Sequence, residues 1–198
     1  FASVGKKTGN YCIVGGQTAL KDAKAIVVSE GYATSKSVEK VAKKEDAATV
    51  AAFDSNNLLG VVKSLHELHP DKPIIIAGDD DKASELKPPR YENAGKEKAI
   101  AAANAVNGSY VLPVFGVGEA ERGLSDFNDL ENKSKLGQAA LERQLRTAVK
   151  KAVARSLSEE NSQSIQREKT KEVEKRVQRQ EKQQTFMSPP PKRRSASR

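Results

Sequence analysis

Three short apolar runs constrain the fold of this chain more than any other feature of its sequence. They span Ala25 to Val28, Ala47 to Phe53 and Ile74 to Ala77, and segments with helical spacing of apolar residues separate them. Buried strands of a parallel sheet have this continuous apolar character, and parallel strands need long, usually helical, connections. The alternation therefore predicts an α/β fold with a doubly wound, mostly parallel sheet.

The segments between the runs carry helix signals. In TSKSVEKVAKK, either Thr34 or Ser35 can cap a helix with one apolar face, and in DSNNLLGVVKSLHELH, Asp54 or Ser55 can do the same. A further helix, GKEKAIAAANAV, leads to a fourth apolar run, SYVLPVF. Pro113 inside that run predicts an edge strand or a strand end. We therefore expect a Rossmann-like sheet of about four strands flanked by helices.

The pattern changes towards the C-terminus. We expect residues 1–134 to form the α/β domain and residues 135–185 to form a charged helical extension. An apolar stripe from Leu141 to Leu157 begins that extension, and Gln, Glu, Lys and Arg dominate after it. The last residues, 186–198, are too poor in apolar groups to fold, so we expect a disordered basic tail.

Charge is unevenly divided between these parts. The whole chain has a formal net charge of +8, and residues 151–198 hold 13 Lys and Arg against 6 Asp and Glu. A basic extension on a near-neutral domain suits a polyanion partner, but a solvated helix and linker would have the same composition. Charge alone leaves both interpretations open.

The location of the protein leaves weaker signals. No apolar run has the length of a transmembrane helix, and the single cysteine, Cys12, is typical of a reducing compartment. We expect a cytoplasmic protein without a membrane partner. Because the sequence starts at Phe1, we also expect it to be part of a longer polypeptide with other domains.

Acidic residues follow the apolar runs. Glu30 comes after the first run, Asp54 after the second, and Asp79, Asp80 and Asp81 after the third. Ligands of doubly wound sheets bind beyond the carboxyl ends of the strands, so these carboxylates should converge on one crevice. Such a cluster repels itself unless it holds protons or a hard cation. Oxygen ligands suit Mg²⁺ or Mn²⁺, and Mg²⁺ in turn implies a phosphate ester or nucleotide as substrate.

The three consecutive aspartates have different expected roles. Strand-like alternation places Asp79 and Asp81 on one side and Asp80 on the other, which makes Asp79 and Asp81 the expected metal-binding pair. The alternative is a polar turn at a strand end, with all three carboxylates facing solvent. Glu30 on a preceding strand end favours the metal site.

Five motifs in order resemble a known family. The segments EGYATSKSV, VAAFDSNNL, IIIAGDDD, NAGKEKAIAAANAV and SDFNDL are similar in sequence and spacing to the Toprim domain. The closer resemblance is to the primase-like Toprim domains of plasmid and phage mobilisation and replication proteins, and it covers roughly residues 10 to 132. It implies a Toprim fold and a magnesium-dependent reaction on nucleic acid.

The resemblance assigns roles to matching residues. Glu30 looks like the Toprim glutamate, which acts as general acid or base and can share in the metal site, while Asp79 and Asp81 look like its magnesium-binding pair. Asp126 and Asp129, in SDFNDL, resemble the later acidic motif of primase-type Toprim domains. They either add to the metal site or only cap their own helix.

Three further residues are candidates for binding a nucleotide. Asn93 and Lys96 stand at the start of a helix, where free backbone N–H groups and a lysine can receive a phosphate. Helix capping by Asn93 is the alternative. Lys82, next to the aspartates, could contact a triphosphate or only reduce the local repulsion.

The resemblance implies a DNA primase type of nucleotidyl transfer, with single-stranded DNA or RNA and nucleoside triphosphates as partners. Two alternatives remain open from the sequence: a Toprim phosphodiesterase or nuclease, and a non-catalytic DNA-binding module of a larger relaxase-type protein. The sequence also leaves open whether this part of the chain is active by itself.

Overall fold

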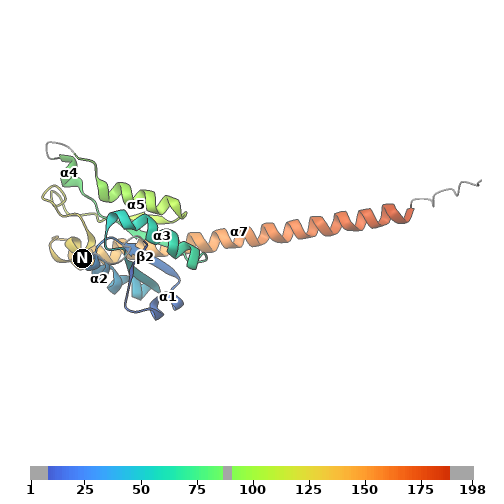
Figure 1. Ribbon diagram of the computed structural model, residues 1–198, viewed down its shortest axis with the longest axis horizontal. Helices are drawn as coiled ribbons and strands as arrows, with labels where there is room; N and C mark the ends of the chain where they lie inside the picture. Colours follow the sequence, from blue (N-terminus) through green and yellow to red (C-terminus); the bar gives the residue numbers. More distant parts are fainter. Residues whose placement is uncertain (1–8, 87–90, 188–198) are drawn as a thin grey trace, which may run out of the picture. The chain divides into compact units, whose positions relative to one another are not determined.

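The computed structural model describes residues 9–86 and 91–187. These residues form two compact units that divide between Ser156 and Leu157. The first unit contains an α/β sheet with helices on both faces (Figure 1), which confirms the fold class expected from the apolar runs.

The sheet has five strands in the order β1-β3-β2-β4-β5. Strands β3, β2, β4 and β5 run parallel to one another, so the carboxyl ends of β2, β3 and β4 meet at one edge. The strands are β1 (Cys12–Val14), β2 (Ala25–Ser29), β3 (Ala47–Ala51), β4 (Ile74–Ala77) and β5 (Ser109–Val111).

Strand β1 is the strand that the apolar runs do not predict. It pairs antiparallel with β3, with Ile13 opposite Val50. Three residues are too few for a visible alternation of apolar and polar side chains, so nothing in the sequence separates this strand from a loop. At the other edge, β5 ends before Pro113, as the proline predicts.

One face of the sheet is covered by α3 (Ser55–Leu68) and α5 (Ala94–Ala105), which lie side by side (Figure 1). Aliphatic side chains of β2, β3 and β4 form a core with the helices on this face. Its buried members include Ile26, Val28, Val50, Ile74, Ile76, Leu58, Val61, Leu65, Ala99 and Ala103.

The opposite face is covered by α2 (Tyr32–Ala42), α6 (Phe127–Asn132) and the start of α7 (Gly137–Met187). The alternate side chains of the strands point to this second core, because successive residues of a strand face opposite ways. Its buried members include Val27, Ile75, Val38, Val41, Phe127, Leu130, Leu141, Leu145 and Val149. The stripe that begins at Leu141 is therefore part of the first unit's core as far as Val153, whereas Leu157 at its end is exposed.

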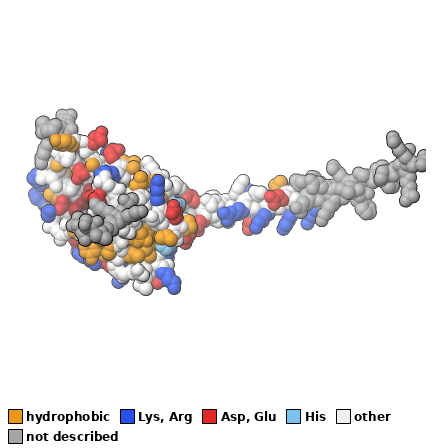
Figure 2. Space-filling model, viewed as in Figure 1, with side chains coloured by type: hydrophobic (Ala, Val, Ile, Leu, Met, Phe, Trp, Pro, Cys, Tyr) orange, Lys and Arg blue, Asp and Glu red, His pale blue; other side chains and the backbone are white. Residues whose placement is uncertain are grey.

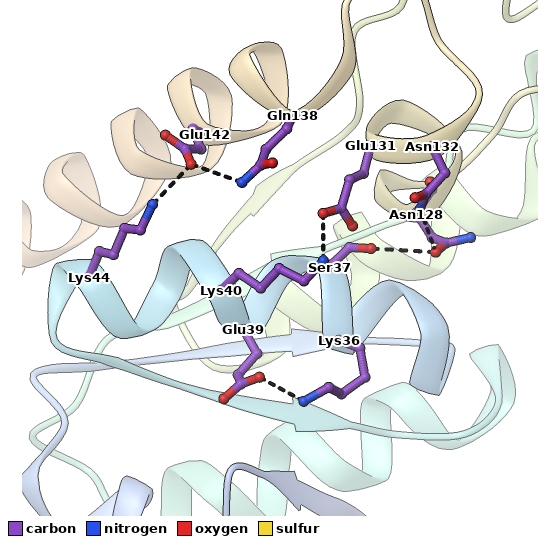
Figure 3. Close-up of polar contacts among 10 residues, drawn as sticks. All are labelled: Lys36, Ser37, Glu39, Lys40, Lys44, Asn128, Glu131, Asn132, Gln138 and Glu142. Atoms are coloured by element: carbon purple, nitrogen blue, oxygen red, sulfur yellow. Dashed lines mark hydrogen bonds and ion pairs between the residues drawn. The ribbon is translucent and has the colours of Figure 1, made fainter.

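Polar contacts join α2 to α6, and the 3₁₀ turn that follows α2 to α7 (Figure 3). The Lys40 ammonium lies 2.6 Å from the Glu131 carboxylate in α6, and the Lys44 ammonium lies 3.0 Å from Glu142 in α7. Both lysines are more than half exposed, so each ion pair contributes at most about 1 kcal/mol. The buried apolar contacts therefore dominate the packing of this layer.

The remaining helices are short: α1 (Thr18–Asp22), a 3₁₀ turn (Lys43–Glu45) and α4 (Lys82–Leu86). From Leu157 on, α7 forms the second unit, with lysine and arginine side chains recurring along it (Figure 2). No helix within the described ranges combines the length and apolarity needed to cross a membrane. The expected domain boundary after residue 134 stays a prediction, and most of the expected tail, residues 188–198, lies outside the described residues.

Candidate active site

Glu30 leaves the sheet at the carboxyl end of β2, directly before the first turn of α2. Burial raises the pKa of its carboxyl above the usual range. A hydrogen bond from the Ser55 backbone and the positive charge of Lys98 oppose that rise, and the charges of Asp54 and Asp81 add to it. Glu30 is therefore a half-buried acid whose charge depends on its neighbours.

Asp79 follows β4 after one glycine and is the most perturbed acid of the described residues. Its Oδ1 atom is shielded from solvent and has no hydrogen-bond partner within residues 9–86 and 91–187. Burial, followed by the charges of Glu30, Asp126, Asp81 and Asp129, raises the pKa of Asp79 to about 8. Four other carboxylates thus act on this one group, and without a cation Asp79 holds a proton at neutral pH.

Asp80 and Asp81 are held by the first turn of α5. The Asn93 side-chain oxygen accepts from the Asp81 backbone N–H at 2.8 Å, and its amide nitrogen donates to Asp80 Oδ1 at 2.7 Å. The Gly95 backbone N–H donates to Asp81 Oδ2 at 3.1 Å. The Asp81 carboxylate is thereby held against the start of α5, while Asp80 binds Asn93.

Asn93 is buried and also accepts from the Lys96 backbone N–H at 3.3 Å. These bonds favour the capping alternative for Asn93, since its amide is already occupied. Lys96 lies half-buried in the first turn of α5. Lys82 pairs with Glu121 at 2.9 Å, and both side chains are largely exposed. A nucleotide contact by Asn93, Lys96 or Lys82 stays a prediction.

Asp126 and Asp129 lie at the start of α6. Asp126 Oδ1 accepts from the Asp129 backbone N–H at 2.6 Å, and Asp129 Oδ2 accepts from the Ser125 backbone N–H at 3.1 Å. Asp129 also pairs with Lys133 at 2.7 Å. Both acids therefore cap their helix, and their negative charges still reach Asp79. The two roles left open by the sequence are compatible.

Two residues have contacts near the carboxylates that the sequence did not predict. The Lys98 ammonium donates to the Ser55 hydroxyl at 2.8 Å and is the positive charge next to Glu30. The Thr34 hydroxyl donates to Asp126 Oδ2 at 2.8 Å. The helix cap expected from Thr34 or Ser35 is wrong, because α2 already begins at Tyr32 with Gly31 as its N-cap. Asp54 does cap α3, as expected.

The donor set of this edge fits a hard cation, although it is not a closed cage. In residues 9–86 and 91–187, no group of three or more His, Cys, Asp or Glu side chains is arranged to hold a metal ion. Mg²⁺ needs only one or two carboxylates, because water and substrate phosphate fill its other positions. A shielded carboxylate oxygen without a partner, surrounded by like charges, is the group that such an ion would stabilise.

Comparisons with known proteins agree with these features. The model of the Toprim domain family matches residues 25–135. The chain is 34% identical over 243 residues to a protein of Escherichia coli named DNA primase TraC, covering 94% of this chain and 22% of that protein. A second Escherichia coli protein of the same name is 51% identical over 119 residues, which cover 60% of this chain and 8% of that protein. The chain thus spans a minor part of both relatives. No solved structure matches it.

Proposed function

Because the chain belongs to the Toprim domain family, we propose that it is the Mg²⁺- or Mn²⁺-dependent module of a primase-like protein that transfers nucleotides to a nucleic-acid strand. The shielded, unpartnered oxygen of Asp79 carries this proposal. The two relatives named as DNA primases support the reaction type. The complete activity requires the longer protein if other domains supply the template or primer site.

We assign the cation to Asp79 and Asp81. Asp79 brings a carboxylate whose repulsion by its neighbours a cation would remove. Asp81 adds a carboxylate whose charge also acts on Asp79 and whose Oδ2 is fixed by the Gly95 backbone N–H. Asp126 and Asp129 add negative charge while their oxygens remain bound to backbone and side-chain donors. When bound, the cation supplies charge neutralisation at the phosphates of the nucleotide.

Glu30 has the properties of a general base for this reaction. Its raised pKa lies closer to neutral pH than that of a solvated glutamate, which favours proton transfer at neutral pH. In the reaction, a strand's terminal 3′-hydroxyl oxygen attacks the α-phosphorus of a nucleoside triphosphate. The bond from that phosphorus to pyrophosphate breaks, and Glu30 takes the hydroxyl proton. Lys98 beside Glu30 keeps the carboxylate charged and ready to accept it.

A metal titration with labelled single-stranded DNA and the four ribonucleoside triphosphates tests this function. Wild type should extend or start a strand with Mg²⁺ or Mn²⁺, and Glu30→Gln and Asp79→Asn should not. Glu67→Gln and Asp71→Asn are matched controls, because both residues are exposed and far from the carboxylate cluster along their elements. Glu67 lies at the C-terminal end of α3, and Asp71 precedes the N-terminal end of β4.

The products separate the alternatives. Metal-dependent shortening of the DNA, lost in the same two variants, would identify a phosphodiesterase instead of a nucleotidyltransferase. Binding of DNA without any product, unaffected by either variant, would identify a non-catalytic docking module. Both outcomes contradict the proposed reaction.

A further inference from the structure

We propose that Phe53 and Tyr32 form an aromatic platform on which a nucleobase stacks beside the carboxylate cluster. The platform rests on the proposed function, because it needs a nucleic acid or nucleotide at this edge of the sheet. None of the Toprim motifs considered above gives a role to these two rings. They are singled out by their place in the fold, their exposure and the backbone of Phe53.

The register of β2 and β3 brings the two residues to the same edge. Ser29 pairs with Ala51, and the Ala52 backbone N–H donates to the Ser29 carbonyl at 2.9 Å, so the pairing continues to the ends of both strands. Phe53 lies two residues beyond Ala51, and Tyr32 lies three residues beyond Ser29. Both rings therefore leave adjacent strand ends, next to the acids that follow the same strands.

Both rings are about half exposed. Tyr32 is 50% exposed and Phe53 is 48% exposed, and neither belongs to the two cores. Single exposed apolar residues are common on protein surfaces. Tyr32 and Phe53, however, follow neighbouring strand ends, as Glu30 and Asp54 of the carboxylate cluster do.

The backbone of Phe53 strengthens the argument. Its φ is +65°, in the left-handed region that a bulky side chain rarely adopts. The other described non-glycine residues with positive φ are Asp46 and Asn107, whose short polar side chains tolerate this conformation. Glycine at position 53 would make the same turn at no steric cost. The ring is therefore not required by the turn, and the backbone conformation at this position is unfavourable for a bulky side chain.

Base stacking explains why a ring stands there. Aromatic faces stack on nucleobases of any sequence, and proteins that bind single strands use such rings together with groups that contact the backbone. At this edge the carboxylates would engage phosphates through the cation, so a base of the same nucleic acid must find a partner nearby. Phe53 and Tyr32 offer two apolar faces for it. The base can belong to the single strand or to the nucleoside triphosphate.

The platform is tested by measuring how the whole chain binds a fluorescent single-stranded oligonucleotide and its abasic counterpart. Each affinity is measured once in EDTA and once in Mg²⁺. Wild type should prefer the oligonucleotide that carries bases. Phe53→Gly and Tyr32→Ala should each weaken that binding about tenfold and leave the abasic affinity unchanged. Tyr32→Phe should retain wild-type affinity, and Tyr110→Ala, which removes an exposed ring from β5, should have no effect.

Phe53→Gly also separates stacking from folding. Because glycine relieves the positive φ, its melting temperature should equal or exceed that of wild type, so weaker binding cannot reflect unfolding. A parallel titration with ATP identifies the source of the base. If the Phe53→Gly and Tyr32→Ala variants lose affinity for ATP and keep affinity for the oligonucleotide, the platform holds the incoming nucleotide.

The inference is overturned if Phe53→Gly and Tyr32→Ala both bind the oligonucleotide and ATP like wild type. It is also overturned if wild type fails to bind ATP and either binds the abasic oligonucleotide as tightly as the one with bases or binds no oligonucleotide at all. These results leave the metal test of the proposed function untouched, since that test reads product formation in Glu30→Gln and Asp79→Asn. Conversely, base-dependent binding in EDTA that is lost in Phe53→Gly would support the platform even if no product formed.

Discussion

Gly95 lies against Asp79 so closely that a Cβ on Gly95 would come within 2.8 Å of the Asp79 carbonyl oxygen and 2.9 Å of the Asp79 Cβ. The first turn of α5 therefore rests directly on the residue with the shielded carboxylate. This contact lets the Gly95 backbone N–H donate to Asp81. One small residue thus packs against Asp79 and holds the carboxylate of Asp81.

Gly95→Ala should separate α5 from Asp79. The added methyl group must displace backbone, which costs about 1–3 kcal/mol of stability, and divalent metal affinity should fall about tenfold or more. Ala101→Gly is a matched control, because it destabilises the exposed side of the same helix by about 1 kcal/mol without touching the aspartates. Calorimetric Mn²⁺ titrations of both variants check this. Equal metal affinity in both would contradict the role of the contact.

The sequence predicted which strand ends and acidic residues form this edge of the sheet, because the strands and helices follow from the spacing of apolar residues. Runs such as Ile74 to Ala77 give the strands, and the topology of parallel strands then places Glu30 and Asp79 at one edge. The contact of Gly95 with Asp79, and of Lys98 with Ser55, depends on how α5 docks on the sheet. Docking is set by three-dimensional packing, which leaves no periodic signal in one sequence.

The helix caps also show that contacts between distant residues cannot be predicted from a local sequence pattern. Asp54 caps α3 as its pattern predicts. Thr34 has equally good capping chemistry, yet its hydroxyl donates to Asp126, a residue 92 positions further on. A local pattern cannot exclude a distant partner for the same side chain. The positive φ of Phe53 is hidden for a related reason, because a sequence gives no sign that a phenylalanine adopts a glycine conformation.

Asp79→Asn should stabilise the metal-free protein. The pKa of Asp79 is about 8 in the folded protein, well above the 3.8 of an ordinary aspartate in an unfolded chain. Between pH 4 and pH 8 the folded state thus keeps a proton that the unfolded state has lost, and the stability of wild type falls as pH rises, by up to about 1.4 kcal/mol per pH unit. Asparagine removes this dependence.

Urea unfolding in EDTA at pH 5, 6.5 and 8 measures the effect. The free energy of unfolding of Asp79→Asn should rise relative to that of wild type by about 1–4 kcal/mol between pH 5 and pH 8, as linkage to the Asp79 proton requires. Asp71→Asn, at an exposed position, should follow wild type. A constant difference between Asp79→Asn and wild type across this range would contradict the raised pKa.

Lys98→Gln should raise the pKa of Glu30 further. The positive charge of Lys98 favours the charged form of Glu30, so its removal leaves burial and the nearby aspartates less opposed. The titration of the Glu30 side-chain carbon, followed by NMR, should move to higher pH, and the acid limb of any metal-dependent activity should move the same way. Lys63→Gln, on the exposed side of α3, is the control. An unchanged Glu30 titration would show that Lys98 does not act on this acid.

Thr49→Val should stabilise the fold. The Thr49 hydroxyl is buried in β3 and has no hydrogen-bond partner among the described residues, so its desolvation is not repaid. Valine has nearly the same shape without the hydroxyl, and we expect a gain of about 1 kcal/mol in the free energy of unfolding. Thr34→Val is the contrasting variant, because its hydroxyl binds Asp126 and its loss should destabilise. Destabilisation by Thr49→Val would mean that the hydroxyl has a partner.

Direct binding of Mn²⁺, followed by electron paramagnetic resonance, tests the central claim that the carboxylates around Asp79 hold a divalent cation. Wild type should bind the ion more tightly as pH rises towards about 8, because the Asp79 proton competes with the metal. Asp79→Asn should lose about tenfold or more in affinity and most of the pH dependence, whereas Asp71→Asn should match wild type. Equal Mn²⁺ affinity in Asp79→Asn and wild type at pH 8 would contradict the claim.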